Sequence, residues 1–103
     1  MISMDDERKA VAKAQSVLSG LAPTSPRNDE IAFALRYAAR LVTAGMAQGF
    51  SSDAALNDLR SDAATALNAV AGSLDARTLS RDVINNARRA VAGLLAGFDR
   101  SSG

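Results

Sequence analysis

Apolar residues recur at steps of three and four along most of the chain, which is the spacing of one helical face. Glycine, proline and short polar residues separate these runs, and such residues end and begin helices. No segment alternates apolar and polar residues as a half-buried strand would. The pattern predicts an all-α protein with four helices, over residues 5–19, 28–48, 52–71 and 76–98.

The residues between the runs also predict how the helices end and connect. Gly20, Gly49 and Gly72 each follow a run and have an apolar residue close behind, as in the left-handed cap with positive φ. The expected N-caps are Asn28, then Ser51 or Ser52, then Asp75 or Thr78. Because short connections favour antiparallel neighbours, we expect one domain over 1–103, a small antiparallel bundle with loose termini at 1–4 and 100–103.

The composition predicts a close-packed core rich in alanine. Hydrophobic residues make up 48% of the chain but aromatic residues only 4%. The first helix has the smallest core side chains, so we expect it to be the least firmly held. The expected core stripes are Ala10, Ala14, Val17 and Leu21 in the first helix, Leu56, Leu59, Ala63, Ala66 and Val70 in the third, and Ile84, Ala87, Val91, Leu94 and Phe98 in the fourth.

The helix over 28–48 is apolar around most of its circumference. At about 100° per residue, it carries two apolar sectors whose centres lie roughly 150° apart. Its polar residues form only a narrow wedge. The first sector, the expected core face, is Ile31, Leu35, Ala38 and Val42, the second is Phe33, Tyr37, Leu41 and Ala44, and the wedge is Arg36, Arg40 and Thr43.

Two interpretations of the second sector remain open. Either this helix is central and touches all three others, or the sector lies on the surface and binds a second copy or another protein. Exposed aromatic residues beside arginine are typical of contact surfaces, and a symmetric dimer would use one such patch twice. The expected partner-binding residues are Phe33, Tyr37, Leu41, Ala44 and Arg40.

An alternative hypothesis is a nucleic-acid-binding accessory protein. Arg77, Arg81 and Arg88 fall on one flank of the predicted last helix, where guanidinium groups could contact phosphates. The same arginines could instead be solvated or paired with acids of the third helix. Twelve Lys and Arg against eleven Asp and Glu give no basic footprint, so nucleic acid is the less favoured partner.

Little in the chain supports catalysis. It contains no His and no Cys, which removes the usual general base, the thiolate nucleophile and the commonest metal ligands. Asp58 and Asp62 stand one turn apart and could share a hard cation, but no second acidic helix completes a site. We expect no enzyme activity, no cofactor and no metal.

The remaining features indicate the general class of protein. The chain begins with acidic residues and no apolar signal segment follows, and no apolar run is long enough to span a membrane. Abundant alanine, with arginine favoured over lysine, suggests a bacterial, cytoplasmic protein. The expected function is a protein–protein interaction module, in the manner of small helical adaptors, inhibitors, immunity proteins or chaperones, although no motif selects one of these.

Overall fold

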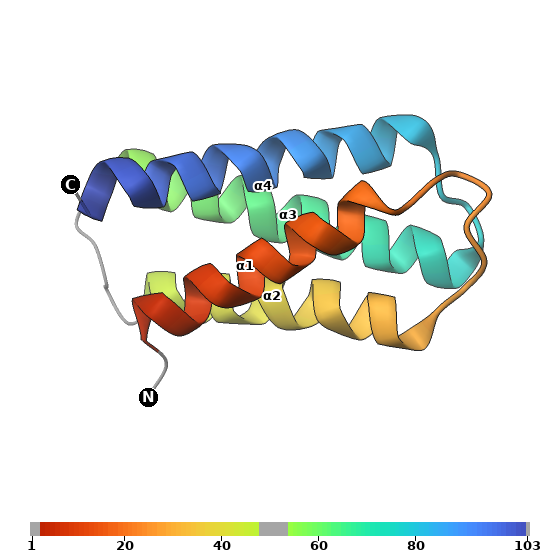
Figure 1. Ribbon diagram of the computed structural model, residues 1–103, viewed down its shortest axis with the longest axis horizontal. Helices are drawn as coiled ribbons and strands as arrows, with labels where there is room; N and C mark the ends of the chain where they lie inside the picture. Colours follow the sequence, from red (N-terminus) through yellow and green to blue (C-terminus); the bar gives the residue numbers. More distant parts are fainter. Residues whose placement is uncertain (1–2, 48–53, 103) are drawn as a thin grey trace.

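A computed structural model describes residues 3–47 and 54–102 (Figure 1). They form four helices, α1 (Met4–Ser19), α2 (Asp29–Ala47), α3 (Ala54–Ala76) and α4 (Arg81–Ser102), with no strand among the described residues. The prediction of an all-α bundle is confirmed. The predicted cap Gly49, the last residue of the predicted second helix and the predicted start of the third at Ser51 or Ser52 lie outside the described residues.

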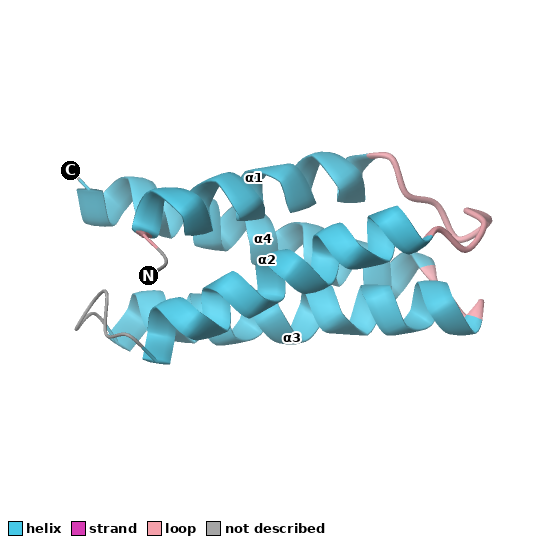
Figure 2. Ribbon diagram, turned by 90° about the horizontal axis from the view of Figure 1, so that it is seen from below, coloured by secondary structure: helices cyan, strands magenta, loops and turns pink. Residues whose placement is uncertain are grey.

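The helices are arranged as a ring in which sequence neighbours are also neighbours in space. α1 packs against α2 and α4, and α3 packs against the same two helices, whereas the diagonal pairs make no backbone approach in the described residues. Consecutive helices run antiparallel, and α1 crosses its neighbours at an angle (Figures 1 and 2). Each helix therefore turns one face to the centre and keeps another face outside.

The core is built from alanine and branched aliphatic side chains, with Phe98 as its only buried aromatic residue among those described. The predicted stripes of α3 and α4 are buried, with Leu59 partly so. Of the predicted stripe of α1, Ala14 and Leu21 are buried as expected. Ala10 and Val17 lie at the edge of the core, and Val11 and Leu18 are fully buried in their place. Glu7 lies on the same buried face, one turn before Val11.

Polar caps hold the beginnings of α1 and α2. Ser3 caps α1 in a capping box with Asp6, so the helix begins inside the terminus that we expected to be loose. α4 likewise continues to Ser102. Asn28 caps α2 as predicted, since its Oδ1 accepts hydrogen bonds from the backbone of Glu30 and Ile31 at 3.0 and 3.1 Å.

The expected glycine caps are confirmed only in part where the structure describes them. Gly20 is the C-cap of α1, as predicted, but with a φ of −94° and not the expected positive one. α3 continues through Gly72 to Ala76, because burial of Ala71 and Leu74 outweighs the cost of about 1 kcal/mol for a helical glycine. The left-handed residue is Arg77, with a φ of 59°.

The hydrogen bonds around Arg77 form the Schellman motif that ends α3. The amide of Thr78 donates to the carbonyl of Ser73 at 2.9 Å, and the amide of Arg77 donates to that of Leu74 at 3.3 Å. The cap of α4 is Ser80 in place of Asp75 or Thr78, and its hydroxyl accepts from the amide of Val83 at 3.2 Å. The last helix therefore begins later than predicted.

Candidate interaction surface

Phe33 and Tyr37 lie on the surface of α2. They are 68% and 46% exposed and are the only large hydrophobic side chains exposed among the described residues. Their rings stack on each other, with centroids 5.9 Å apart and planes inclined by 13°. The two rings form one flat apolar patch, one helical turn in length.

The ring arrangement explains why this patch is open. α2 packs against α1 and α3 and does not approach α4 in the described part of the chain. The interpretation in which neighbouring helices cover both apolar sectors of α2 is therefore wrong, because Phe33 and Tyr37 stay exposed. Two neighbours cover the first apolar sector and leave the middle of the second sector facing outward.

A groove of about 840 Å³ runs between α1 and α2 beside this patch. Apolar side chains of both helices contribute to it, and acidic and basic residues stand at its rims. Phe33 and Tyr37 belong to its wall, so the patch and the groove form one continuous surface. The full lining is Asp6, Lys9, Ala10, Lys13, Val17, Asp29, Glu30, Ile31, Phe33, Ala34 and Tyr37.

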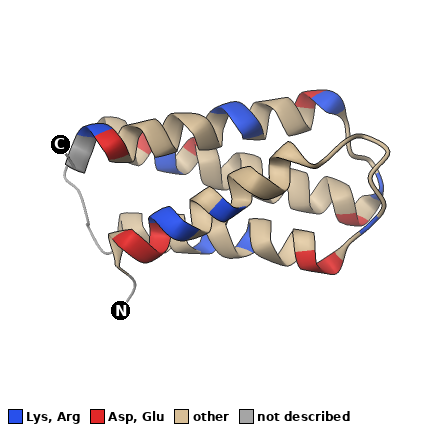
Figure 3. Cartoon of the chain, viewed as in Figure 1, with Lys and Arg blue, Asp and Glu red and all other residues tan. Residues whose placement is uncertain are grey.

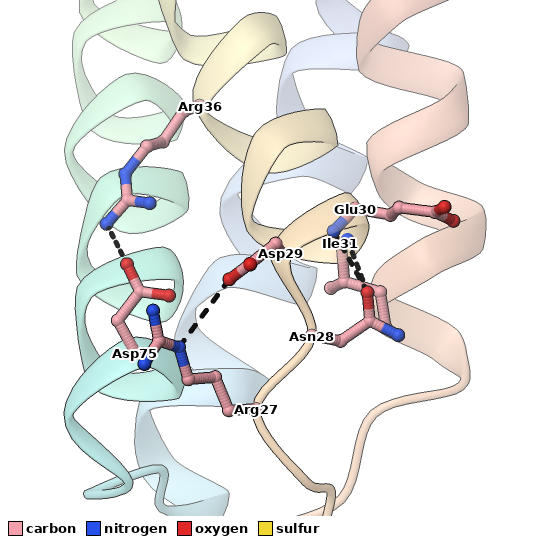
Figure 4. Close-up of polar contacts among 7 residues, drawn as sticks. All are labelled: Arg27, Asn28, Asp29, Glu30, Ile31, Arg36 and Asp75. Carbon is pink, nitrogen blue, oxygen red and sulfur yellow. Dashed lines mark hydrogen bonds and ion pairs between the residues drawn. The ribbon is translucent and has the colours of Figure 1, made fainter.

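The charged residues along α2 differ in whether they already have partners. Arg36 is paired with Asp75 of α3 at 2.7 Å, and Arg27 with Asp29 at 3.5 Å (Figure 4). The carboxylate of Glu30 points away from both pairs, on the side of α2 that faces α1. Within the described residues, neither Glu30 nor the exposed Arg40 has an ion pair, which leaves both charges available.

The structure keeps most, but not all, of the predicted partner-binding residues at the surface. Phe33, Tyr37 and Arg40 are exposed, and Ala44 is half-buried. Leu41 is only 5% exposed, so its place on a contact surface was wrong. Leu41 lies at the margin of the second sector, nearest to the first. We refer to Phe33, Tyr37, Arg40 and Ala44 as the outer face of α2.

The predicted arginine stripe is not assembled as a phosphate site. Arg77 lies in the loop between α3 and α4 and not, as the sequence predicts, on the last helix, while Arg81 is exposed at the first turn of α4. Arg88 donates to the carbonyls of Leu18 at 2.8 and 3.0 Å and of Leu21 at 3.0 Å. Its guanidinium therefore donates hydrogen bonds at the C-terminal end of α1, where the last carbonyls have no donor within the helix.

The predicted carboxylate pair also remains isolated. Asp58 and Asp62 are both exposed on α3. Within residues 3–47 and 54–102, no three acidic side chains gather closely enough to hold a metal ion. Nothing in the described part of the chain therefore adds a third ligand to this pair.

The core contains a buried ion pair that the sequence pattern did not predict. Arg60 of α3 donates from Nε and Nη2 to Oε1 of Glu7 of α1 at 3.2 and 2.9 Å, and both side chains are 0% exposed. Arg60 also donates to Asn57 at 3.0 Å and lies 5.7 Å from the ring centroid of Phe98. The sequence does contain a signal for this pair. Glu7 lies on the apolar stripe of α1, and Arg60, with the opposite charge, lies on the apolar stripe of α3.

The environment of this pair makes the Glu7 carboxyl a weaker acid. Burial raises the pKa of the Glu7 carboxyl above its ordinary value of 4.5, and the hydrogen bonds and charge of Arg60 offset part of that rise. Oε2 of Glu7 is buried without a hydrogen-bond partner. The pair joins the diagonal helices α1 and α3 through the core, away from the surface, and we assign it to the fold and not to a site.

Taken together, the geometry defines a small four-helix bundle with one open apolar face. No family model, curated protein or solved structure matches the chain significantly. In the described residues, no helix is both long and apolar enough to cross a bilayer.

Proposed function

We propose that this protein is a non-enzymatic protein–protein interaction module that binds its partner through the outer face of α2. The observation that carries this proposal is the exposed, stacked pair of Phe33 and Tyr37 beside an apolar groove. Exposed aromatic residues with a neighbouring arginine are the composition of the energetically important centres of interfaces.

The energetics support a role in binding rather than in folding. Full burial of an aromatic side chain such as Phe contributes about 1.5–3 kcal/mol, and the folded monomer leaves most of that free energy unused at Phe33. The stacked rings are held on a helix, so little side-chain freedom is lost when a partner covers them. A partner with an apolar face therefore gains more at this position than elsewhere on the described surface.

The test compares Phe33→Asp and Tyr37→Asp with the matched control Ala69→Asp, which places the same charge on an exposed position of α3. We expect all three variants to keep wild-type helicity by circular dichroism and to change the free energy of unfolding by no more than about 1 kcal/mol. The two α2 variants should lose assembly, measured by light scattering, or retention of partner proteins on the immobilised chain.

The control should behave as the wild type in both assays. Unfolding of Tyr37→Asp would place that side chain in the core and remove the surface on which the proposal rests. Unchanged mass and unchanged retention in both α2 variants would also overturn it.

A further inference from the structure

A second pattern runs along the outer face of α2 once Glu30 is included. Glu30, Phe33, Tyr37, Arg40 and Ala44 follow one another at steps of three, four, three and four. This is the spacing of the contact seam of a coiled coil. The first four side chains are exposed and Ala44 is half-buried, so the structure leaves the seam open along its length.

The order of residues in this seam is self-complementary. Glu30 lies as far before residue 35 as Arg40 lies after it, and Phe33 and Tyr37 are related in the same way. A second α2 that runs in the opposite direction therefore places Arg40 opposite Glu30 and Tyr37 opposite Phe33. A two-fold axis repeats each of these contacts.

We propose that the partner at this face is a second copy of the chain, bound by antiparallel packing of the two α2 helices about a two-fold axis level with residue 35. This inference rests on the proposed function and adds the identity of the partner. The charges select the direction, because a parallel pair in register would set Glu30 against Glu30 and Arg40 against Arg40, and like charges in contact are unfavourable.

The state of the two charges in the monomer supports the pairing. Neither has an ion pair among the described residues, whereas the neighbouring Arg36 and Asp29 are engaged within the chain (Figure 4). Figure 3 shows the same order of charges along α2, with acidic residues at its beginning and basic residues farther along the helix.

The first test is a charge exchange, read as the dimer dissociation constant by light scattering or sedimentation over a range of concentrations. We expect Glu30→Arg and Arg40→Glu each to weaken the dimer by about tenfold or more, because each change replaces two attractive contacts with two repulsive ones. The double variant Glu30→Arg/Arg40→Glu should return close to the wild-type constant. That recovery also shows that the substituted helix still folds.

Controls and outcomes separate this inference from the proposed function. Asp58→Arg makes the same change of charge on α3, off the seam, and should leave the dimer unchanged. A wild type that stays monomeric at every concentration overturns the second copy as partner, but it leaves partner retention through Phe33 and Tyr37 to be judged separately. If Tyr37→Asp abolishes the dimer but neither Glu30→Arg nor Arg40→Glu weakens it, only the proposed register is overturned.

The second test determines the direction of packing by disulfide formation. Because the chain has no cysteine, only the introduced cysteines can form a disulfide. In the antiparallel dimer, the two positions 30 are separated by about 15 Å along the helix axis, too far for a disulfide. We expect no homodisulfide from Glu30→Cys alone, but a heterodisulfide when it is mixed with Arg40→Cys. The mixed dimer keeps one Glu30–Arg40 contact. Efficient homodisulfide formation by Glu30→Cys would overturn the antiparallel arrangement.

Discussion

At the scale of single residues, the least expected feature is the charged pair at the centre of the bundle. Arg60 and Glu7 are completely buried, and one carboxylate oxygen has no partner. A buried pair gains Coulomb energy but loses the hydration of both ions, so its net contribution to stability is small. Each charge, however, depends on the other, because a lone buried charge is much more costly than the pair.

This dependence predicts strong coupling between the two positions. Glu7→Met or Arg60→Met alone should lower the free energy of unfolding by about 3–5 kcal/mol, since each leaves an uncompensated buried group. The double variant Glu7→Met/Arg60→Met should cost far less than the sum, and a net change near zero is expected from burial of similar apolar volume. Urea denaturation of all four proteins gives the coupling directly. If the losses of unfolding free energy in the two single variants add up to that of the double variant, Glu7 and Arg60 are not coupled and the prediction is wrong.

At the scale of helices, the C-terminal end of α1 needs explanation, because the last carbonyls of a helix have no donor within it. Its last turn contains no basic residue. Arg88 of α4 supplies the missing donors, since its guanidinium binds the carbonyls of Leu18 and Leu21. The contact ties the C-terminal end of α1 to α4 and places a positive charge where the helix dipole favours one.

Removal of this contact should loosen α1 more than the other helices. We expect Arg88→Met to destabilise the protein by about 1–3 kcal/mol, the cost of unsatisfied carbonyls that were bound to a charged donor. The exposed neighbour Arg89→Met removes the same charge and serves as the control, with little expected effect. Hydrogen exchange should show the loss of protection concentrated in α1. Uniform loss across all four helices, or an equal effect of Arg89→Met, would contradict this role.

Helix type was predictable from the sequence throughout, and helix ends only in part: the end of α1 and the cap of α2 were predicted, whereas the end of α3 and the start of α4 were not. The three- and four-residue periodicity follows directly from side-chain geometry, so the stripes of α3 and α4 were found correctly. Gly72 was read as a stop, but tertiary burial of Leu74 carried the helix beyond it and left the cap to Arg77. Local residue preferences are worth about 1 kcal/mol, and core burial exceeds that.

At the scale of the whole molecule, the arrangement of the ring decides which apolar face is covered. Periodicity identified two apolar sectors on α2, but it could not say how many neighbours the helix has. In the structure α2 packs against two helices, α1 and α3. This arrangement leaves Phe33 and Tyr37 exposed and Leu41 buried. The residues of the candidate surface were therefore largely predictable, while the exposure that makes them a surface depends on topology.

The charge balance of the whole chain also allows the titration of Glu7 to be detected in the pH dependence of the free energy of unfolding. The chain has no histidine and a net charge of +1, so few side chains titrate between pH 5 and 8 and general charge repulsion is small. Burial raises the folded-state pKa of Glu7 above the ordinary value of 4.5 that it regains on unfolding. Between these two values, the folded protein binds more protons at this site than the unfolded chain does.

Stability should consequently fall as the pH rises through the raised pKa of Glu7, and the stabilising contribution of its protonated form is fully present only at lower pH. We expect the free energy of unfolding of Glu7→Gln to lack this decline, since the amide does not titrate. The measurement is urea denaturation of both proteins at intervals from pH 4.5 to pH 8. A wild-type stability that rises across this interval relative to Glu7→Gln would mean that Arg60 outweighs burial and lowers the pKa of Glu7, and the sign argued here would be reversed.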